Sequence, residues 1–590
     1  MIDLILIALN LVVFWSLWRA QRLPVAALCP PLFIFGRIAG FWLVGADFSE
    51  IKSLSWVGLG AELSATAQLV SAASAALALN LTAWLGSWVS AEQLKDDSEG
   101  SEAQTLHLLS GALLPLSALM WLLCINVDAY GDGTLGGPNQ LALLLSAGLA
   151  GLLGLRRGVS VSESLEGVRA AVSDTLEPLL ILLLIGALAG TWMLSGVVPA
   201  MIDYGLMFLA PSYYLVASCL LCACVSVASG SSWSTIATIG VALMGVGQAL
   251  GFSPALCAGA LISGAYFGDK MSPLSDTTNL APAMAGGELF AHIRAMLWTT
   301  LPSFSITLLL FTLIGLGFIE AGSATGLDLS STEAVRQGLR ATVWIHPVLF
   351  VVPGLVVFLI ARRVSTIPTL AAGALFGGLV AVWAQPELIA HVGGAGGGFK
   401  ASFIAVMNAL SHSVSLPSSD PMVAKLLSSK GMEGMLGTVW LILCALCFGG
   451  VMERTGALRV ISEALLKRVE SDRSLVATTV GSGLFLNATA SDQYLAIVVP
   501  GRMYREEYAA RGFEPEALSR TLEDSATVTS VLIPWNTCGA MQASVLGVAT
   551  FAYAPYCFFN WISPMMTLLF AFMGWRQLKC DPEDHLGEDS

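Results

Sequence analysis

The sequence predicts an all-α, polytopic membrane protein built on two inverted-topology repeats with re-entrant hairpins and broken helices. Its 590 residues are 55% hydrophobic and only 12% charged, whereas soluble proteins carry about 25% charged residues. Apolar runs recur along most of the chain, and they predict about 14–17 membrane segments of roughly 17–25 residues each. Two of these apolar regions resemble each other and are interrupted by small polar residues.

The charged residues and cysteines exclude several function classes. The net charge is −13, and many acids lie in Glu92–Glu102 and Asp581–Asp589, which we expect to be solvated segments. This pattern gives no reason to expect nucleic-acid binding, so the expected partner is the lipid bilayer. Cys444 and Cys447 form a C-x-x-C pair within an apolar run. We interpret such cysteines as packing residues, because neither His nor a second Cys pair lies nearby.

The chain is expected to contain five regions. Residues 1–105 add extra N-terminal helices, and 106–320 form the first part of a core with repeat 1. Residues 321–432 form connecting helices, 433–575 form repeat 2, and 576–590 form an acidic cytoplasmic tail.

The internal repeat rests on three landmarks in the same order. Each copy has a glycine-rich apolar segment, then a polar break, then a run of acidic and hydroxyl residues near a proline. The first copy contains Leu182–Gly196, Ser229–Thr235 and Leu274–Pro282, and the second contains Leu441–Gly456, Asn487–Asp492 and Leu522–Pro534. Such repeats with interrupted helices are typical of secondary transporters.

Charges beside the repeats predict that their orientations are opposite. Val197–Ser212 contains neither Lys nor Arg, whereas its counterpart contains Arg459, Lys467, Arg468 and Arg473. Because Lys and Arg concentrate in cytoplasmic loops, the first segment is expected outside and the second inside.

The polar breaks are the candidate ion sites. Pro273 disfavours helix at Ser272, so a break is expected there, and Gly264 and Gly268 lower helix stability just before it. Backbone unwinds at membrane depth only where it is buried in protein or lines a cavity. A carboxylate at the bilayer centre costs roughly 2.5–3.5 kcal/mol, so intramembrane acids are functional candidates. These acids are Asp269, Asp276, Asp492, Glu523 and Asp524.

At these residues the sequence resembles the NhaC family of sodium/proton antiporters, within the ion transporter superfamily. Gly264–Gly286 contains Gly-Asp-Lys-Met-Ser-Pro-Leu-Ser-Asp-Thr-Thr-Asn-Leu-Ala-Pro and is similar to the family's most characteristic block. Further similar blocks are Ser229–Thr235, Thr489–Tyr494, Leu518–Ser525 and Ile533–Thr537. The resemblance implies a scaffold and a transport domain with alternating access, and it covers residues 140–575.

The resemblance also implies the residues of a Na+ site. One half would contain Ser231, Ser232, Asp276, Thr277, Thr278 and Asn279, and the other Asn487, Thr489, Asp492, Asp524, Thr527 and Asn536. Asp269, Lys270 and Glu523 are further candidates. The implied cargo is Na+ and H+, with no cofactor and no catalytic residue. A carboxylate that holds either a cation or a proton is a sufficient mechanism for exchange.

The leading hypothesis is Na+/H+ exchange in the bacterial cytoplasmic (inner) membrane. The sequence does not determine the oligomeric state, and a homodimer is one option. A second hypothesis is a Na+- or H+-coupled exchanger of a small organic acid (malate/lactate-like) or amino acid. A bare cation is favoured because Lys270 is the only intramembrane cation near the acids. An intramembrane enzyme is the remote alternative, since the sequence lacks H-E-x-x-H and has no G-x-S-x-G at the breaks.

Overall fold

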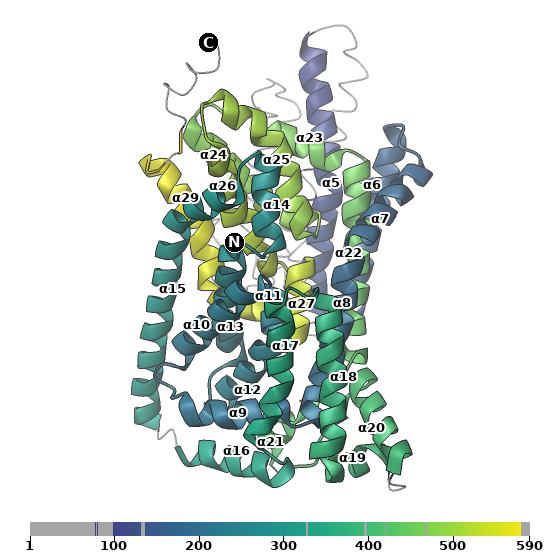
Figure 1. The fold of residues 1–590 in the computed structure, drawn as a ribbon. Coiled ribbons are helices and arrows are strands. Elements are labelled where there is room, and N and C mark those ends of the chain that lie inside the picture. Colours follow the sequence, from purple (N-terminus) through teal and green to yellow (C-terminus); the bar gives the residue numbers. More distant parts are fainter. Residues whose placement is uncertain are drawn as a thin grey trace, which may run out of the picture. The chain divides into compact units, whose positions relative to one another are not determined.

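A computed structural model describes residues 77, 80, 98–130, 136–325, 329–394, 398–418, 420–466, 469–576, 578 and 579 (Figure 1). Most of the predicted N-terminal region 1–105 and most of the predicted tail 576–590 lie outside the described residues. The chain divides into two compact units, with residues 1–173 and 443–468 in the first and residues 174–442 and 469–590 in the second.

The first unit contains three consecutive helices and the segments after residue 442. These elements are α5 (Ser98–Tyr130), α6 (Pro138–Arg156), α7 (Val161–Asp174), the end of α22 (Leu436–Arg454) and α23 (Ala457–Leu466). Gly167 and Gly450 allow α7 and α22 to approach backbone to backbone, because a Cβ at Gly167 would lie 2.4 Å from the carbonyl oxygen of Gly450. An ion pair of 3.4 Å between Glu166 and Arg454 lies beside this contact.

The second unit holds most of the helices and all of the candidate site residues. Its first elements, up to residue 361, are α8 (Leu176–Leu194), α9 (Val197–Phe208), α10 (Tyr214–Ser229), α11 (Ser232–Thr235), η2 (Ile236–Gly240), α12 (Val241–Ala249), α13 (Pro254–Met271), α14 (Asp276–Ala285), α15 (Leu289–Thr325), α16 (Leu329–Thr342), η3 (Pro347–Phe350) and α17 (Val351–Ala361).

The remaining elements of this unit include a short antiparallel pair of strands. They are α18 (Thr366–Ala384), α19 (Pro386–Gly393), α20 (Gly398–Ser411), β1 (Val414–Ser415), α21 (Pro421–Leu426), β2 (Ser428–Ser429), η4 (Glu433–Met435), α24 (Asp472–Thr489), α25 (Gln493–Ala510), α26 (Pro515–Leu522), η5 (Glu523–Thr527), η6 (Ser530–Leu532), α27 (Thr537–Leu546), α28 (Thr550–Tyr553), η7 (Ala554–Tyr556) and α29 (Phe558–Met573). In the strand pair, Val414 lies opposite Ser429.

The predicted helical, membrane-spanning character is confirmed. Among the described residues, six helical segments are long and apolar enough to cross a membrane, or up to eight if each bent helix pair forms one span. The bent pairs are 333–342 with 347–361, at 84°, and 550–556 with 558–573, at 57°. Broken helices are therefore part of this fold, as the sequence predicts.

Gly264 and Gly268 serve close packing. The helix does not end at these glycines, because α13 continues to Met271. A Cβ at Gly264 would lie 2.0 Å from the carbonyl oxygen of Cys219 in α10. The hydroxyl of Ser226 in α10 donates a hydrogen bond of 2.6 Å to the carbonyl of Ala265. The predicted break at Pro273 is confirmed, since α14 begins only at Asp276.

A common order of elements runs through both halves of this unit. Each half has a helix, a break with positive φ, a helix, a segment that begins with proline, a second break and a ten-residue helix. Gly230 (φ 68°) matches Ser491 (φ 59°) at the first break. Pro254 matches Pro515, and Gly286 matches Gly547, with the same separation along the chain in all three pairs. In this register Asp524 corresponds to Ser263 rather than to Asp276.

Candidate functional site

A cavity of about 240 Å³ lies in the second unit where four helices begin. Its lining includes residues at the N-termini of α11, α14, α25 and α27. These helices begin at the breaks that the sequence marks with small polar residues. Of the sequence-predicted residues, Ser231, Ser232, Asp269, Asp276, Thr277 and Asp492 line this cavity. The two halves of the unit thus meet at one polar space.

Asp269 is held by the first break. Its Oδ2 accepts hydrogen bonds of 3.0 Å from the backbone N–H of Ser232 and of 2.7 Å from the Ser232 hydroxyl. The Ser231 hydroxyl accepts from the N–H of Ser234 at 3.2 Å and so caps α11. A carboxylate at a helix N-terminus is favoured by the helix dipole, so Asp269 is positioned at the cavity by these contacts.

Asp276 and its neighbours open α14. Asp276 is exposed and faces the cavity, whereas Thr277 and Thr278 are buried. The Thr278 hydroxyl donates to the carbonyls of Asp269 (3.3 Å) and Lys270 (3.1 Å). Asn279 donates to the carbonyls of Pro273 and Ser275. Thr278 and Asn279 therefore hold the break together and do not line the cavity.

Asp492 has the corresponding place in the second half. Its Oδ1 accepts from the N–H groups of Tyr494 and Leu495, at 2.9 and 3.1 Å, and caps α25. The amide of Asn487 donates to the carbonyl of Ala526, and the amide of Asn536 donates to Asn487. Both asparagines are fully buried. They fasten the second break, and neither lines the cavity.

The charge of the cavity is one-sided. Five acids line it (Asp174, Glu177, Asp269, Asp276 and Asp492), and neither Lys nor Arg is among its described lining residues. At the N-terminus of each of the four helices a side chain already accepts from one or two backbone N–H groups: Ser231, Ser275, Asp492 and Asn536. Such a space favours a cation over an anion.

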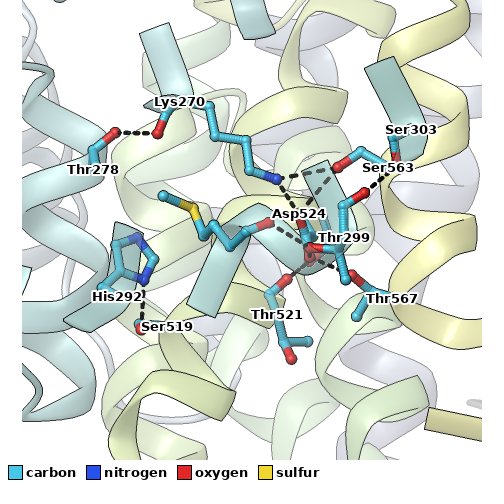
Figure 2. Close-up of polar contacts among 12 residues, drawn as sticks. Lys270, Thr278, His292, Thr299, Ser303, Ser519, Thr521, Asp524, Ser563 and Thr567 are labelled. Atoms are coloured by element: carbon cyan, nitrogen blue, oxygen red, sulfur yellow. Dashed lines mark hydrogen bonds and ion pairs between the residues drawn. The ribbon is translucent and has the colours of Figure 1, made fainter. Parts of the chain in front are cut away.

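Asp524 lies outside the cavity lining, in a closed cluster (Figure 2). It forms an ion pair with Lys270, and both side chains are fully buried. The Thr299 hydroxyl donates to Oδ2 of Asp524 at 2.7 Å, the Ser563 hydroxyl donates to Oδ1 at 3.2 Å, and the Thr567 hydroxyl also donates to Oδ2. A buried ion pair with its remaining lone pairs satisfied is the arrangement that makes such a pair tolerable.

Three of the predicted or candidate residues have buried polar atoms without a hydrogen-bond partner among the described residues. These atoms are both carboxyl oxygens of Glu523 and the hydroxyls of Thr489 and Thr527. Glu523 begins η5, directly before Asp524. Native proteins leave few buried polar atoms unpaired, so such a group marks a functional candidate.

Three hydroxyl residues around Asp524 are not among the sequence-predicted site residues: Thr299 on α15, and Ser563 and Thr567 on α29. The sequence contains a pattern that could have identified these residues. Thr299 and Ser303, like Ser563 and Thr567, are spaced four residues apart in otherwise apolar helices, and residues at this spacing share one helix face. All four side chains are fully or almost fully buried. Figure 2 shows Thr299, Ser563 and Thr567 around Asp524, with Ser303 next to Thr299.

Comparison with known proteins finds relatives that are named as antiporters. The pattern of the Na+/H+ antiporter family matches residues 264–575. The chain is 37% identical to the Na+/H+ antiporter NhaC of Alkalihalophilus pseudofirmus, over 74% of the chain and 90% of the relative. It is 35% identical to NhaC of Bacillus subtilis, over 78% and 97%. It is also 35% identical to a malate-2H+/Na+-lactate antiporter of Bacillus subtilis, over 74% and 90%.

Proposed function

Because the chain belongs to the Na+/H+ antiporter family, we infer that it is a multi-pass membrane transporter that exchanges Na+ for H+. The bacterial relatives favour the cytoplasmic membrane as its location. The observation that carries the inference is the acidic cavity at the four helix N-termini. Its carboxylates and hydroxyls are the ligand types that a hard monovalent cation prefers.

The dimensions of the cavity suit a partly hydrated ion. Since about 10–15 Å³ of cavity volume is enough to hold one water, a cavity of about 240 Å³ has room for Na+ with part of its hydration shell. Asp276 is exposed in the cavity and would meet the ion first. Asp269 is held by Ser232 and would bind it more deeply, with Asp492 facing it from the second half. A proton competing for the same carboxylates gives exchange.

Alternating access through two inverted repeats is part of the proposal. The shared order of elements supports the repeat, and the charges beside it support opposite orientations. Val197–Ser212 lacks Lys and Arg, whereas Arg459 and its neighbours flank the second copy. Two helix breaks that meet at one polar cavity are the arrangement expected of such a transporter.

The same cavity argues against an organic anion as cargo. The malate-2H+/Na+-lactate antiporter shows that relatives at this identity carry such substrates. A carboxylate substrate would need a cationic side chain or free helix N-termini. The described lining of this cavity offers five acids, and each of its four helix N-termini is capped by a side chain.

The test is collapse of an imposed pH gradient in proteoliposomes that contain the full chain. We expect Na+ to collapse the gradient and malate to leave it intact. Neutralising one carboxylate near the ion removes about 4 kcal/mol at 4 Å and an effective dielectric constant of about 20. Asp269→Asn should therefore abolish collapse by Na+, while Glu387→Gln, exposed on α19 outside the cavity, should leave it unchanged. Collapse by malate but not by Na+ would refute the proposed cargo.

A further inference from the structure

The cluster around Asp524 has the composition of a cation site (Figure 2). Asp524 supplies a carboxylate from η5, and three hydroxyls converge on it from α15 and α29: Thr299, Ser563 and Thr567. All four side chains are at most 1% exposed. Carboxylate and hydroxyl oxygens are the ligands of hard monovalent cations, and hydroxyls rotate freely enough to offer either a proton or a lone pair.

The positive charge in this cluster is the side-chain ammonium of Lys270. The ammonium of Lys270 contacts Asp524 and donates a hydrogen bond of 3.2 Å to the Ser563 hydroxyl. Lysine carries a compact point charge on a flexible stem. A buried carboxylate without any cation would be strongly unfavourable. The cluster therefore requires one positive charge, and Lys270 supplies it in this conformation.

We propose that this cluster is a second, occluded Na+ site, distinct from the cavity, and that Na+ binds Asp524, Thr299, Ser563 and Thr567 by displacing the ammonium of Lys270. The inference rests on the proposed function, because it takes the transported cation to be Na+. Lys270 then acts as a built-in competitor that keeps the site neutral while no ion is bound.

The two sites are joined by the last turn of α13. Asp269 lines the cavity, and the next residue, Lys270, reaches the occluded cluster. The hydroxyl of Thr278 holds the carbonyls of both residues to the first turn of α14. Release of Lys270 from Asp524 would therefore act directly on the turn that positions Asp269. This connection offers a route by which ion binding at the occluded site changes the cavity.

The experiment measures Na+ binding to the purified full chain by radioactive Na+ and by Na+-dependent thermal stability, with choline chloride holding the ionic strength. In Lys270→Met the internal competitor is gone, so we expect Na+ to bind at least 10-fold more tightly than in the unaltered protein. Adding Thr567→Val to that variant should weaken binding at least 10-fold. Thr312→Val is the matched control, because Thr312 donates only within α15, to the carbonyl of Leu308.

Equal Na+ affinity in Lys270→Met and the unaltered protein would overturn the proposal, as would equal effects of Thr567→Val and Thr312→Val. If Lys270→Met does not fold, Thr567→Val and Thr299→Val in the unaltered background must raise the KM for Na+ in transport without lowering kcat, and an unchanged KM overturns the proposal. Failure of Na+/H+ exchange in the unaltered protein would instead refute the proposed function. The Na+-binding measurement does not depend on exchange, so the two failures can be told apart.

Discussion

The buried pair of Lys270 and Asp524 gives the sharpest energetic prediction. Both side chains are 0% exposed. Removing one member leaves the other buried without its ion-pair partner, and breaking a buried pair in this way costs about 3–5 kcal/mol. We therefore expect Lys270→Met and Asp524→Asn each to lower the free energy of unfolding by that amount in the absence of Na+. Native proteins have only about 5–15 kcal/mol of stability in total, so either loss is severe.

The double variant, Lys270→Met with Asp524→Asn, should be much milder than the sum of the two. It contains no buried charge in the cluster, and the amide oxygen introduced at position 524 still accepts from the α15 and α29 hydroxyls. The free energy of unfolding of the double variant should fall by less than about 3 kcal/mol, because removing both partners of a buried ion pair is often near neutral. The interaction free energy from the double-mutant cycle should therefore be at least about 3 kcal/mol.

The assay is denaturant unfolding in detergent micelles, with choline chloride in place of Na+. All four members of the cycle are compared at one ionic strength. Additive single losses, with an interaction free energy within about 0.5 kcal/mol of zero, would show that the two side chains do not depend on each other. That result would refute the ion pair and the reasoning built on it.

Two further predictions concern the helix breaks and helix packing. Asp492→Ala removes the acceptor for two N–H groups of α25 and should lower the free energy of unfolding by about 0.5–2 kcal/mol. Asp492→Asn should retain most of the helix cap. Equal unfolding midpoints for the two variants would contradict this expectation. Gly264→Ala places a Cβ 2.0 Å from the carbonyl oxygen of Cys219 and should lower the free energy of unfolding by about 1–3 kcal/mol. Gly481→Ala, with nothing within 4 Å, should be neutral or stabilising in the same unfolding assay.

Much of the fold could be predicted because membrane-spanning helices have strong sequence signals. Long apolar runs, Pro273 and the polar segment Ser229–Thr235 mark helices and breaks directly. The register of the predicted repeat is harder to infer. Acidic and hydroxyl residues occur in α14 after one break and in η5 before another, so similarity of composition paired Leu274–Pro282 with Leu522–Pro534. The positive-φ positions and prolines give a different alignment.

The candidate site was predictable only in part, for a related reason. The acids and hydroxyls at the breaks are conspicuous in sequence, and six predicted residues line the cavity. Sequence does not reveal that Lys270 turns away from Asp269 and pairs with Asp524 across the fold. Nor does it reveal which apolar helix supplies Thr299 or Thr567. Such contacts depend on tertiary packing, which brings together residues that are distant in the chain.

The central claim is that the cavity carboxylates exchange Na+ for H+. The most direct test measures radioactive Na+ uptake and H+ release together in proteoliposomes of the full chain and of Asp269→Asn. We expect Na+ uptake to be accompanied by H+ release in the unaltered protein, added malate to change neither flux, and both fluxes to be lost in the variant. Na+ uptake without H+ release, or uptake that requires malate, would contradict the claim.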